Sequence, residues 1–121
     1  MAKILVVDDD LTVTKFLEML LSMEGHEPTT VNNSSETLEI AEQIHPDLIT
    51  LDLMMPGLSG YELCELLHKD PRFKEIPILI VSAWDDREHT EKADHINVQG
   101  YISKPFRVET LLQKINELTS S

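Results

Sequence analysis

Four short apolar runs in this sequence are each followed at once by side chains that could do chemistry. These side chains belong to Asp8, Asp9, Asp10, Asp52, Ser82 and Lys104. Carboxylates gathered at one place repel one another unless a cation is bound or one of them is protonated. An all-oxygen set of this kind suits Mg²⁺, which keeps several waters and shares positions with phosphate oxygens. A carboxylate can also be a nucleophile, and a lysine and a hydroxyl can hold the anion it receives. These residue types together predict metal-assisted phosphoryl transfer onto an aspartate.

The elements that must position these residues follow from the apolar pattern. Short runs that are largely apolar and β-branched predict five strands, at residues 4–7, 27–31, 48–51, 78–81 and 101–103. Continuous apolar strands are typical of parallel sheets that are covered on both faces. The carboxyl ends of parallel strands meet at one edge of the sheet, where ligands gather in such folds. We therefore expect the aspartates, the hydroxyl and the lysine to converge there.

Longer amphipathic stretches between the strands predict helices. Asp10 and Gly25 bound the first one as its N-cap and its stop, Asn33 and Ser59 open the next two, and Asp70-Pro71 ends the third. A fourth helix is predicted over 86–96, stopped at Asn97, and a fifth over 108–118. The inward-facing residues of the first and third helices are expected to be Val13, Phe16, Leu17, Leu20, Leu21, Leu63, Leu66 and Leu67. Five strand–helix units predict a doubly wound α/β fold.

Composition narrows the classes of function. The 121 residues hold 10 Lys and Arg against 22 Asp and Glu, a net charge of −12. This acidity argues against direct binding to nucleic acid or to anionic membranes, both of which need clustered cations. No run is long enough to span a bilayer. The lone Cys64 is expected to be a partly buried apolar residue, compatible with a reducing cytoplasm. We expect a cytoplasmic single domain over 1–121 with no effector domain.

Four segments together carry a family resemblance. They are ILVVDDD at 4–10, PDLITLDLMMPG at 46–57, IVSA at 80–83 and YISKPF at 101–106. In this order and spacing they resemble the receiver domain of two-component response regulators, over the whole chain. The resemblance implies a (βα)5 flavodoxin-like fold with the strand order 2-1-3-4-5.

The resemblance also implies roles for the acidic residues. Asp52 matches the phosphoacceptor. Asp9 and Asp52 match direct ligands of Mg²⁺, for which Mn²⁺ can substitute, and Asp8 matches a ligand that acts mostly through water. Met54 matches the position whose backbone carbonyl completes the metal site. Asp10, in contrast, needs only its role as a helix cap.

The remaining matched residues imply phosphoryl binding and switching. Ser82, the backbone N–H of Ala83 and Lys104 match the groups that bind the phosphoryl oxygens. Ser82 and Tyr101 match the hydroxyl and the aromatic side chain that move together when the family switches state. The bond between Lys104 and Pro105 matches a peptide that is usually cis in the family.

The function implied is that of a phosphorylated switch and not of an enzyme with a separate substrate. A sensor histidine kinase or a histidine phosphotransfer protein would supply the phosphoryl group. Output to an unknown downstream protein would pass through the fourth helix, the fifth strand and the fifth helix. The protein would be a monomer or a phosphorylation-dependent dimer.

Three alternatives remain at this stage. Residues 8–12 also fit the D-x-D-x-T motif of haloacid-dehalogenase-like phosphatases, in which Asp8 would be the nucleophile. A flavodoxin-like binding module is a second alternative, although three aspartates would repel a ligand's phosphate. A receiver fold that signals without phosphorylation is the third. Labelling by a small phosphodonor separates the first from the receiver, because Asp8 would be labelled in the phosphatase and Asp52 in the receiver.

Met54 and Trp84 match positions that border the phosphoryl group, and Trp84 is bulkier than is usual there. An indole at this place would hinder the in-line water that hydrolyses an aspartyl phosphate. We therefore predict that Trp84→Ala shortens the lifetime of the phosphorylated protein, measured as decay of the phosphorylated mass after removal of the donor. An unchanged or longer lifetime would contradict this role.

Overall fold

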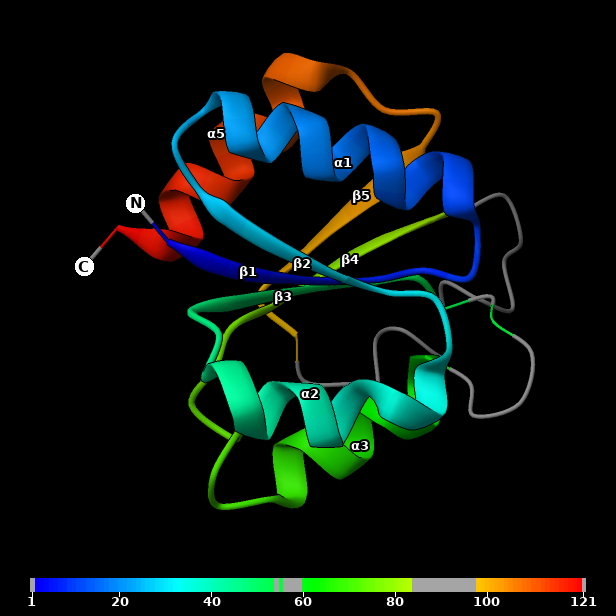
Figure 1. Cartoon of the computed structure of the whole chain (residues 1–121), viewed down its shortest axis with the longest axis vertical. Helices are drawn as coiled ribbons and strands as arrows, with labels where there is room; N and C mark the ends of the chain where they lie inside the picture. Colours follow the sequence, from blue (N-terminus) through cyan, green and yellow to red (C-terminus); the bar gives the residue numbers. More distant parts are fainter. Residues whose placement is uncertain (1, 54, 56–59, 84–97, 121) are drawn as a thin grey trace.

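A five-stranded parallel sheet forms the centre of the protein (Figure 1). The structure is a computed structural model that describes residues 2–53, 55, 60–83 and 98–120. The strands are β1 (Lys3–Val7), β2 (Glu27–Val31), β3 (Leu48–Leu51), β4 (Ile78–Ala83) and β5 (Gly100–Lys104). Their order in the sheet is β2-β1-β3-β4-β5. This confirms the predicted fold class and strand order.

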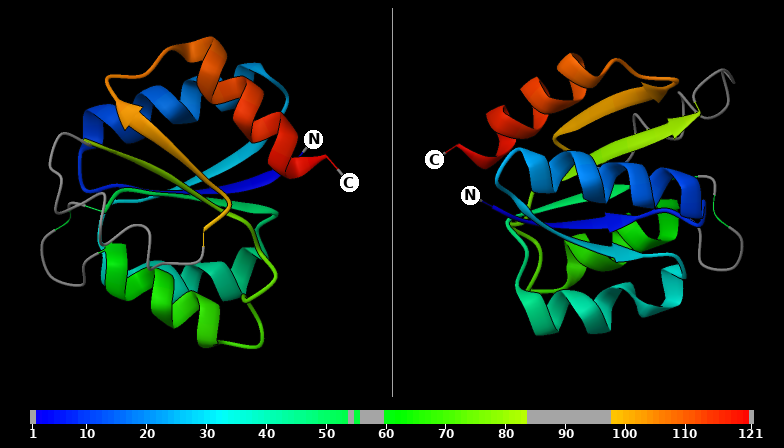
Figure 2. Two further views of the ribbon diagram at one scale, coloured as in Figure 1. Left: turned by 180° about the vertical axis from the view of Figure 1, so that it is seen from behind. Right: turned by 45° about the horizontal axis from the view of Figure 1, so that its top comes forward.

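Helices cover both faces of this sheet. They are α1 (Leu11–Met23), α2 (Thr37–Ile44), α3 (Gly60–Lys69) and α5 (Val108–Thr119), with a short 3₁₀ helix η1 (Ser34–Glu36) before α2. Figures 1 and 2 show α1 and α5 on one face and α2 and α3 on the other. The helix predicted over 86–96 lies outside the described residues, as do the predicted helix boundaries at Ser59 and Asn97. Within the described residues, no helix has the length and apolarity needed to cross a membrane.

The alternation of side chains along each strand divides the core into two apolar clusters. In β1, Leu5 and Val7 face α2 and α3, whereas Ile4 and Val6 face α1 and α5. Cys64 of α3 is an apolar packing residue, as predicted, but it is more completely buried than expected, and burial raises the pKa of its thiol to about 12. The thiol is therefore a packing group rather than a reactive one. Each face of the sheet is thus packed against two helices through its own apolar cluster.

The helix boundaries follow local chemistry. The Asp10 carboxylate caps α1 by accepting hydrogen bonds from the backbone N–H groups of Thr12 (2.9 Å) and Val13 (3.4 Å). Gly25 ends the same segment with a φ of +87°, a backbone conformation that glycine adopts without strain. The sequence did not indicate the end of α2, where His45 has a φ of +50°. Histidine is among the residues enriched in this left-handed region.

Two residues predicted to face inward are partly exposed. Leu66 is 43% exposed, so its predicted burial is wrong. The buried arc of α3 runs through Leu63 and Leu67 to Cys64, and with 3.6 residues per turn this arc turns Leu66 toward solvent. Phe16 is 39% exposed, because it lies at the margin of the α1 stripe. Its ring packs instead beside Phe106, with the two centroids 6.3 Å apart.

The buried hydroxyl of Thr37 generates a prediction about stability. This side chain is fully buried, and its Oγ1 has no hydrogen-bond partner among the described residues. An unpaired buried hydroxyl costs about 1 kcal/mol or more. Thr37→Val, which keeps the shape of the side chain, should therefore raise the free energy of unfolding by about 1 kcal/mol, measured by urea denaturation.

Thr14 provides the matched control, because it is equally buried but its hydroxyl donates a hydrogen bond to the Leu11 carbonyl (3.2 Å). Thr14→Val should therefore be destabilising. Equal losses of stability in the two variants would contradict the assignment of Thr37 as unpaired.

Candidate functional site

The register of three strands brings Asp8 and Asp52 together. Val7 of β1 lies opposite both Val31 of β2 and Leu51 of β3. The backbone N–H of Asp52 donates to the Val7 carbonyl (3.0 Å), and that of Asp8 donates to the Val31 carbonyl (3.1 Å). Each aspartate therefore occupies the first position after its strand, at the same edge of the sheet.

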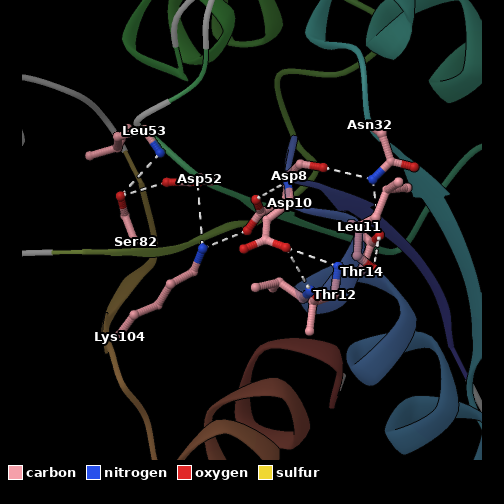
Figure 3. A network of polar contacts seen from close by, with 11 residues as sticks. Asp8, Asp10, Leu11, Thr12, Thr14, Asn32, Asp52, Leu53, Ser82 and Lys104 are labelled. Carbon is pink, nitrogen blue, oxygen red and sulfur yellow. Dashed lines mark hydrogen bonds and ion pairs between the residues drawn. The ribbon is translucent and has the colours of Figure 1, made fainter.

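The carboxylate of Asp52 is held by donors from the two neighbouring strands. Figure 3 shows Ser82 of β4 and Lys104 of β5 pointing toward it. Ser82 Oγ donates to Asp52 Oδ1 at 2.7 Å, and Lys104 Nζ lies 3.4 Å from Asp52 Oδ2. Asp52 is 5% exposed and Ser82 is fully buried. A hydroxyl and an ammonium group thus address different oxygens of one buried carboxylate.

The first residue of α3 lies so close to the end of β3 that a glycine is required there. Gly60, the first residue of α3, donates its N–H to the Leu53 carbonyl (3.4 Å). A Cβ at position 60 would lie only 2.5 Å from the backbone oxygen of Asp52, which no ordinary side chain tolerates. The absence of a side chain there lets α3 begin directly against the backbone that carries Asp52.

Asp8 uses both of its carboxylate oxygens within the protein. Its Oδ2 accepts from Lys104 Nζ at 2.6 Å, and its Oδ1 accepts from the backbone N–H of Asp10 at 2.9 Å. Lys104 is therefore closer to Asp8 than to Asp52, although it contacts both. One lysine bridges two carboxylates that are almost completely buried.

Burial shifts the ionisation of this group of charges. It raises the pKa of Asp8 from the ordinary 3.8 to about 6, against the opposing effect of the hydrogen bonds from Lys104 and Asp10. Burial by itself lowers the pKa of Lys104, but the hydrogen bond to Asp8 and the charge of Asp52 outweigh it and leave this pKa raised. The lysine therefore stays charged, while Asp8 gains a proton more readily than a solvated aspartate.

The three acidic residues form a set of oxygen donors. One carboxylate oxygen from each of Asp8, Asp9 and Asp52 can be chosen so that all three lie within 4.8 Å of one another. Asp9 is exposed, and its carboxylate has no hydrogen-bond partner within the described residues. Hard oxygen donors, one of them open to solvent, fit a partly hydrated Mg²⁺ ion. The structure confirms that these predicted residues meet. Met54, the fourth predicted ligand, lies outside the described residues.

The other predicted site residues lie around this cluster. Ala83 is exposed at the end of β4, where it pairs with Lys104. The peptide bond between Lys104 and Pro105 is cis, as the resemblance implies. Tyr101 lies on β5 opposite Ile80 and is 41% exposed. Trp84, predicted to border the site, lies outside the described residues.

Two residues beside the site, Asn32 and Thr14, are not among those predicted from the sequence. The Asn32 amide donates hydrogen bonds to the backbone oxygen of Asp8 and to Thr14 Oγ1, both at 2.9 Å (Figure 3). Asn32 directly follows β2, so the position after the second strand carried the same kind of signal as the positions after the other four. The predicted site residues follow the other four strands, and none follows the second.

Known proteins resemble this chain in sequence. The ycf27 protein of Cyanophora paradoxa is 38% identical over 116 residues, which are 96% of this chain and 47% of ycf27. Protein PilH of Pseudomonas aeruginosa is 34% identical over 116 residues, which are 96% of each chain. This chain therefore spans about half the length of some relatives, such as ycf27, and nearly all of PilH.

Solved structures resemble it in fold. The chemotaxis protein CheY4 of Vibrio cholerae superimposes with a TM-score of 0.89 and 29% identity, over 98% of each chain. The signal receiver domain of a histidine kinase from Syntrophus aciditrophicus gives a TM-score of 0.93 and 27% identity, over 98% of this chain and 90% of that one. The family model described as the response regulator receiver domain matches residues 4–116. With these matches and the arrangement of its strands, the chain belongs to the receiver domain family of two-component response regulators.

Proposed function

We propose that this receiver domain is a switch that stores a phosphoryl group on Asp52. Receiver domains as a family are phosphorylated by histidine kinases and act on downstream partners. The observation that carries the proposal for this chain is the pair of donors on Asp52, Ser82 Oγ on one oxygen and Lys104 Nζ near the other. A phosphoryl group on Asp52 would present oxygens to the same hydroxyl and ammonium.

The proposed transfer is a displacement at phosphorus. A carboxylate oxygen of Asp52 forms the new O–P bond as the N–P bond of a donor phosphohistidine breaks. The imidazole leaves with the bonding electron pair and takes up a proton from solvent. Lys104, which is charged, then faces added negative charge on Asp52, and we expect it to move from Asp8 toward the phosphoryl oxygens. Ser82 and the N–H of Ala83 would bind the remaining oxygens.

A divalent cation is part of this proposal. Asp9 and Asp52 would bind Mg²⁺ directly, and the bound ion would neutralise the charge that develops on the transferred group. Asp8 would contact the ion mostly through water, and its hydrogen bonds from Lys104 and from the backbone of Asp10 would hold its carboxylate beside the site. Mn²⁺ prefers similar oxygen ligands and would substitute.

The family of the chain weighs against the phosphatase alternative. The receiver domain model matches residues 4–116, and the hydroxyl donor of the site, Ser82 Oγ, contacts the carboxylate of Asp52. We therefore propose that the chain acts on no separate substrate and undergoes only its own phosphorylation and hydrolysis.

Output is proposed to pass through β5 and its neighbours. Ser82 would shift toward a phosphoryl oxygen, and Tyr101, which is partly exposed, would turn inward toward the space that Ser82 leaves. The face that includes β5 and α5 would then bind a downstream protein or a second copy differently in the two states. The helix predicted over 86–96, which lies outside the described residues, is expected to take part in this output. A phosphotransfer protein or a sensor kinase would supply the phosphoryl group in the cytoplasm.

Direct phosphorylation tests the proposal. Incubation with acetyl phosphate and Mg²⁺ should add one phosphoryl mass to the intact protein, and beryllofluoride should form a stable adduct. Asp52→Asn should abolish both, because the amide is not a nucleophile. Peptide mapping of the labelled residue should identify Asp52. Label on Asp8, or an undiminished adduct in Asp52→Asn, would overturn the assignment.

The raised pKa of Asp8 predicts an unusual dependence of stability on pH in the metal-free protein. Between about pH 4 and pH 6 the folded state binds more protons than the unfolded state, because the pKa of Asp8 is about 6 when folded and 3.8 when unfolded. The contribution of Asp8 to the free energy of unfolding should therefore fall as the pH rises through this window, by up to about 3 kcal/mol.

Urea denaturation in EDTA at pH 4.5 and pH 7.5 measures this fall. Asp8→Asn should lose it, whereas Asp9→Asn, at the exposed neighbouring carboxylate, should keep it. Addition of Mg²⁺ at pH 7.5 should restore stability to the wild type. The same pH response in wild type and Asp8→Asn would show that Asp8 does not carry the shift.

A further inference from the structure

Asp9, which on the proposed function binds the metal directly, is the least enclosed of the three aspartates. Asp9 is exposed, and its carboxylate has no hydrogen-bond partner within the described part of the chain. Its position therefore depends on the backbone of residues 8–11, which lead from the end of β1 into the first residue of α1 and which we call the acidic turn. Whatever holds the acidic turn also determines where the Asp9 carboxylate can lie.

Asn32 holds the acidic turn from the end of β2. Its Nδ2 donates one hydrogen bond to the backbone oxygen of Asp8 (2.9 Å) and one to Thr14 Oγ1 (2.9 Å). Thr14 is 1% exposed, and its own hydroxyl donates to the backbone oxygen of Leu11 (3.2 Å). Both amide hydrogens and the threonine hydroxyl are thus used, and the two carbonyls that they reach are those of the first and last residues of the acidic turn.

This arrangement fixes the direction of every hydrogen bond in it. Both partners of the Asn32 nitrogen are acceptors, so this end of the amide must be the NH₂ group. Thr14 donates its only hydroxyl proton to Leu11, so toward Asn32 it can act only as an acceptor. A residue without a donor at position 32 leaves the Asp8 carbonyl and the Thr14 hydroxyl without this hydrogen bond. A residue without a hydroxyl at position 14 leaves one amide hydrogen of Asn32 without its acceptor.

We propose that Asn32 and Thr14 are positioning residues that hold the acidic turn in the geometry that binds Mg²⁺, and that they set the affinity of the site for this ion. The inference rests on the proposed function in that it assigns the metal site to Asp8, Asp9 and Asp52. Second-layer partners of metal ligands commonly change metal affinity about tenfold or more when they are removed. Figure 3 shows Asn32 and Thr14 on the far side of Asp8 from Asp52, Lys104 and Ser82.

This separation predicts a split between metal affinity and reactivity. Weakening the acidic turn should raise the Mg²⁺ concentration needed for half-maximal phosphorylation. It should leave the rate at saturating Mg²⁺ nearly unchanged, because the donors around Asp52 are intact. A residue with only a structural role would lower stability and leave the Mg²⁺ dependence as it is.

Isothermal titration calorimetry with MgCl₂ on the full chain provides the direct test. Asn32→Ala and Thr14→Val should each raise the dissociation constant for Mg²⁺ about tenfold. Thr14→Ser restores the hydroxyl and should recover the wild-type constant. Asn33→Ala is the matched control, because the neighbouring asparagine is exposed and caps η1 through Ser35, away from the acidic turn.

Phosphorylation by acetyl phosphate across a range of Mg²⁺ concentrations provides the second readout. The half-saturating concentration should rise about tenfold in Asn32→Ala and Thr14→Val, with rates at saturation within about twofold of wild type. Should Thr14→Val fail to fold, Asn32→Ala at the half-buried position carries the test.

Two results would overturn the proposal. The first is a wild-type dissociation constant for Mg²⁺ in folded Asn32→Ala. The second is an equal loss of affinity in Asn33→Ala. Failure of the proposed function would look different: the wild type would bind Mg²⁺ in the calorimeter but form no adduct on Asp52, and the calorimetric comparison of variants would still decide the role of Asn32 and Thr14.

Discussion

One ammonium group shared between two buried carboxylates is the interaction on which this site depends. Lys104 lies 2.6 Å from Asp8 and 3.4 Å from Asp52, and a third carboxylate, Asp9, stands beside them. One positive charge cannot balance three negative ones. The loss of solvation on burial, and after it the charge of Asp52, raise the pKa of Asp8. Binding of a cation or a proton would therefore reduce the excess negative charge of the cluster.

The apolar sheet makes such a costly cluster tolerable. Ile4 to Val7, Leu48 to Leu51 and Ile78 to Val81 are buried without exception, and each such side chain contributes on the order of 2 kcal/mol. Because the strands are parallel and in register, the polar residues that follow them all lie at the same edge of the sheet. Central placement of β1 and β3 puts Asp8 and Asp52 side by side, and β4 and β5 add Ser82 and Lys104. The parallel register of the strands therefore produces both the stable apolar core and the repulsion between the buried carboxylates at its edge.

The sequence predicted the elements that depend on apolar periodicity and the residues that follow strand ends. It did not predict features that are determined by tertiary packing. Local pattern predicts the five strands and the cap at Asp10. Parallel topology then predicts that the residues after four of the strands meet, namely Asp8, Asp52, Ser82 and Lys104. The exposure of Leu66 does not, because the pattern alone cannot say on which side of Leu63 and Leu67 the buried arc extends. The left-handed His45 carries no strong signal. Asn32 was predictable in principle, since it follows a strand, but its role depends on an amide reaching Thr14 across the α1–β2 packing.

On the proposed function, the charges of the site explain why the cation and the phosphoryl group would act together. With all three aspartates ionised, the cluster and Lys104 sum to about two negative charges, which one Mg²⁺ ion balances. Phosphorylation replaces the single charge of Asp52 by up to two on the phosphoryl oxygens, and the added charge falls where Ser82 and Lys104 already point. Lys104 can pair with either Asp8 or Asp52. A small change in the charge at Asp52 can therefore shift the ammonium group from one carboxylate to the other. Because Lys104 belongs to β5 and Ser82 to β4, any such redirection acts first on the two strands at one side of the sheet, next to Tyr101 and α5. The other side of the site, held by Asn32 and the acidic turn, can stay in place while this happens.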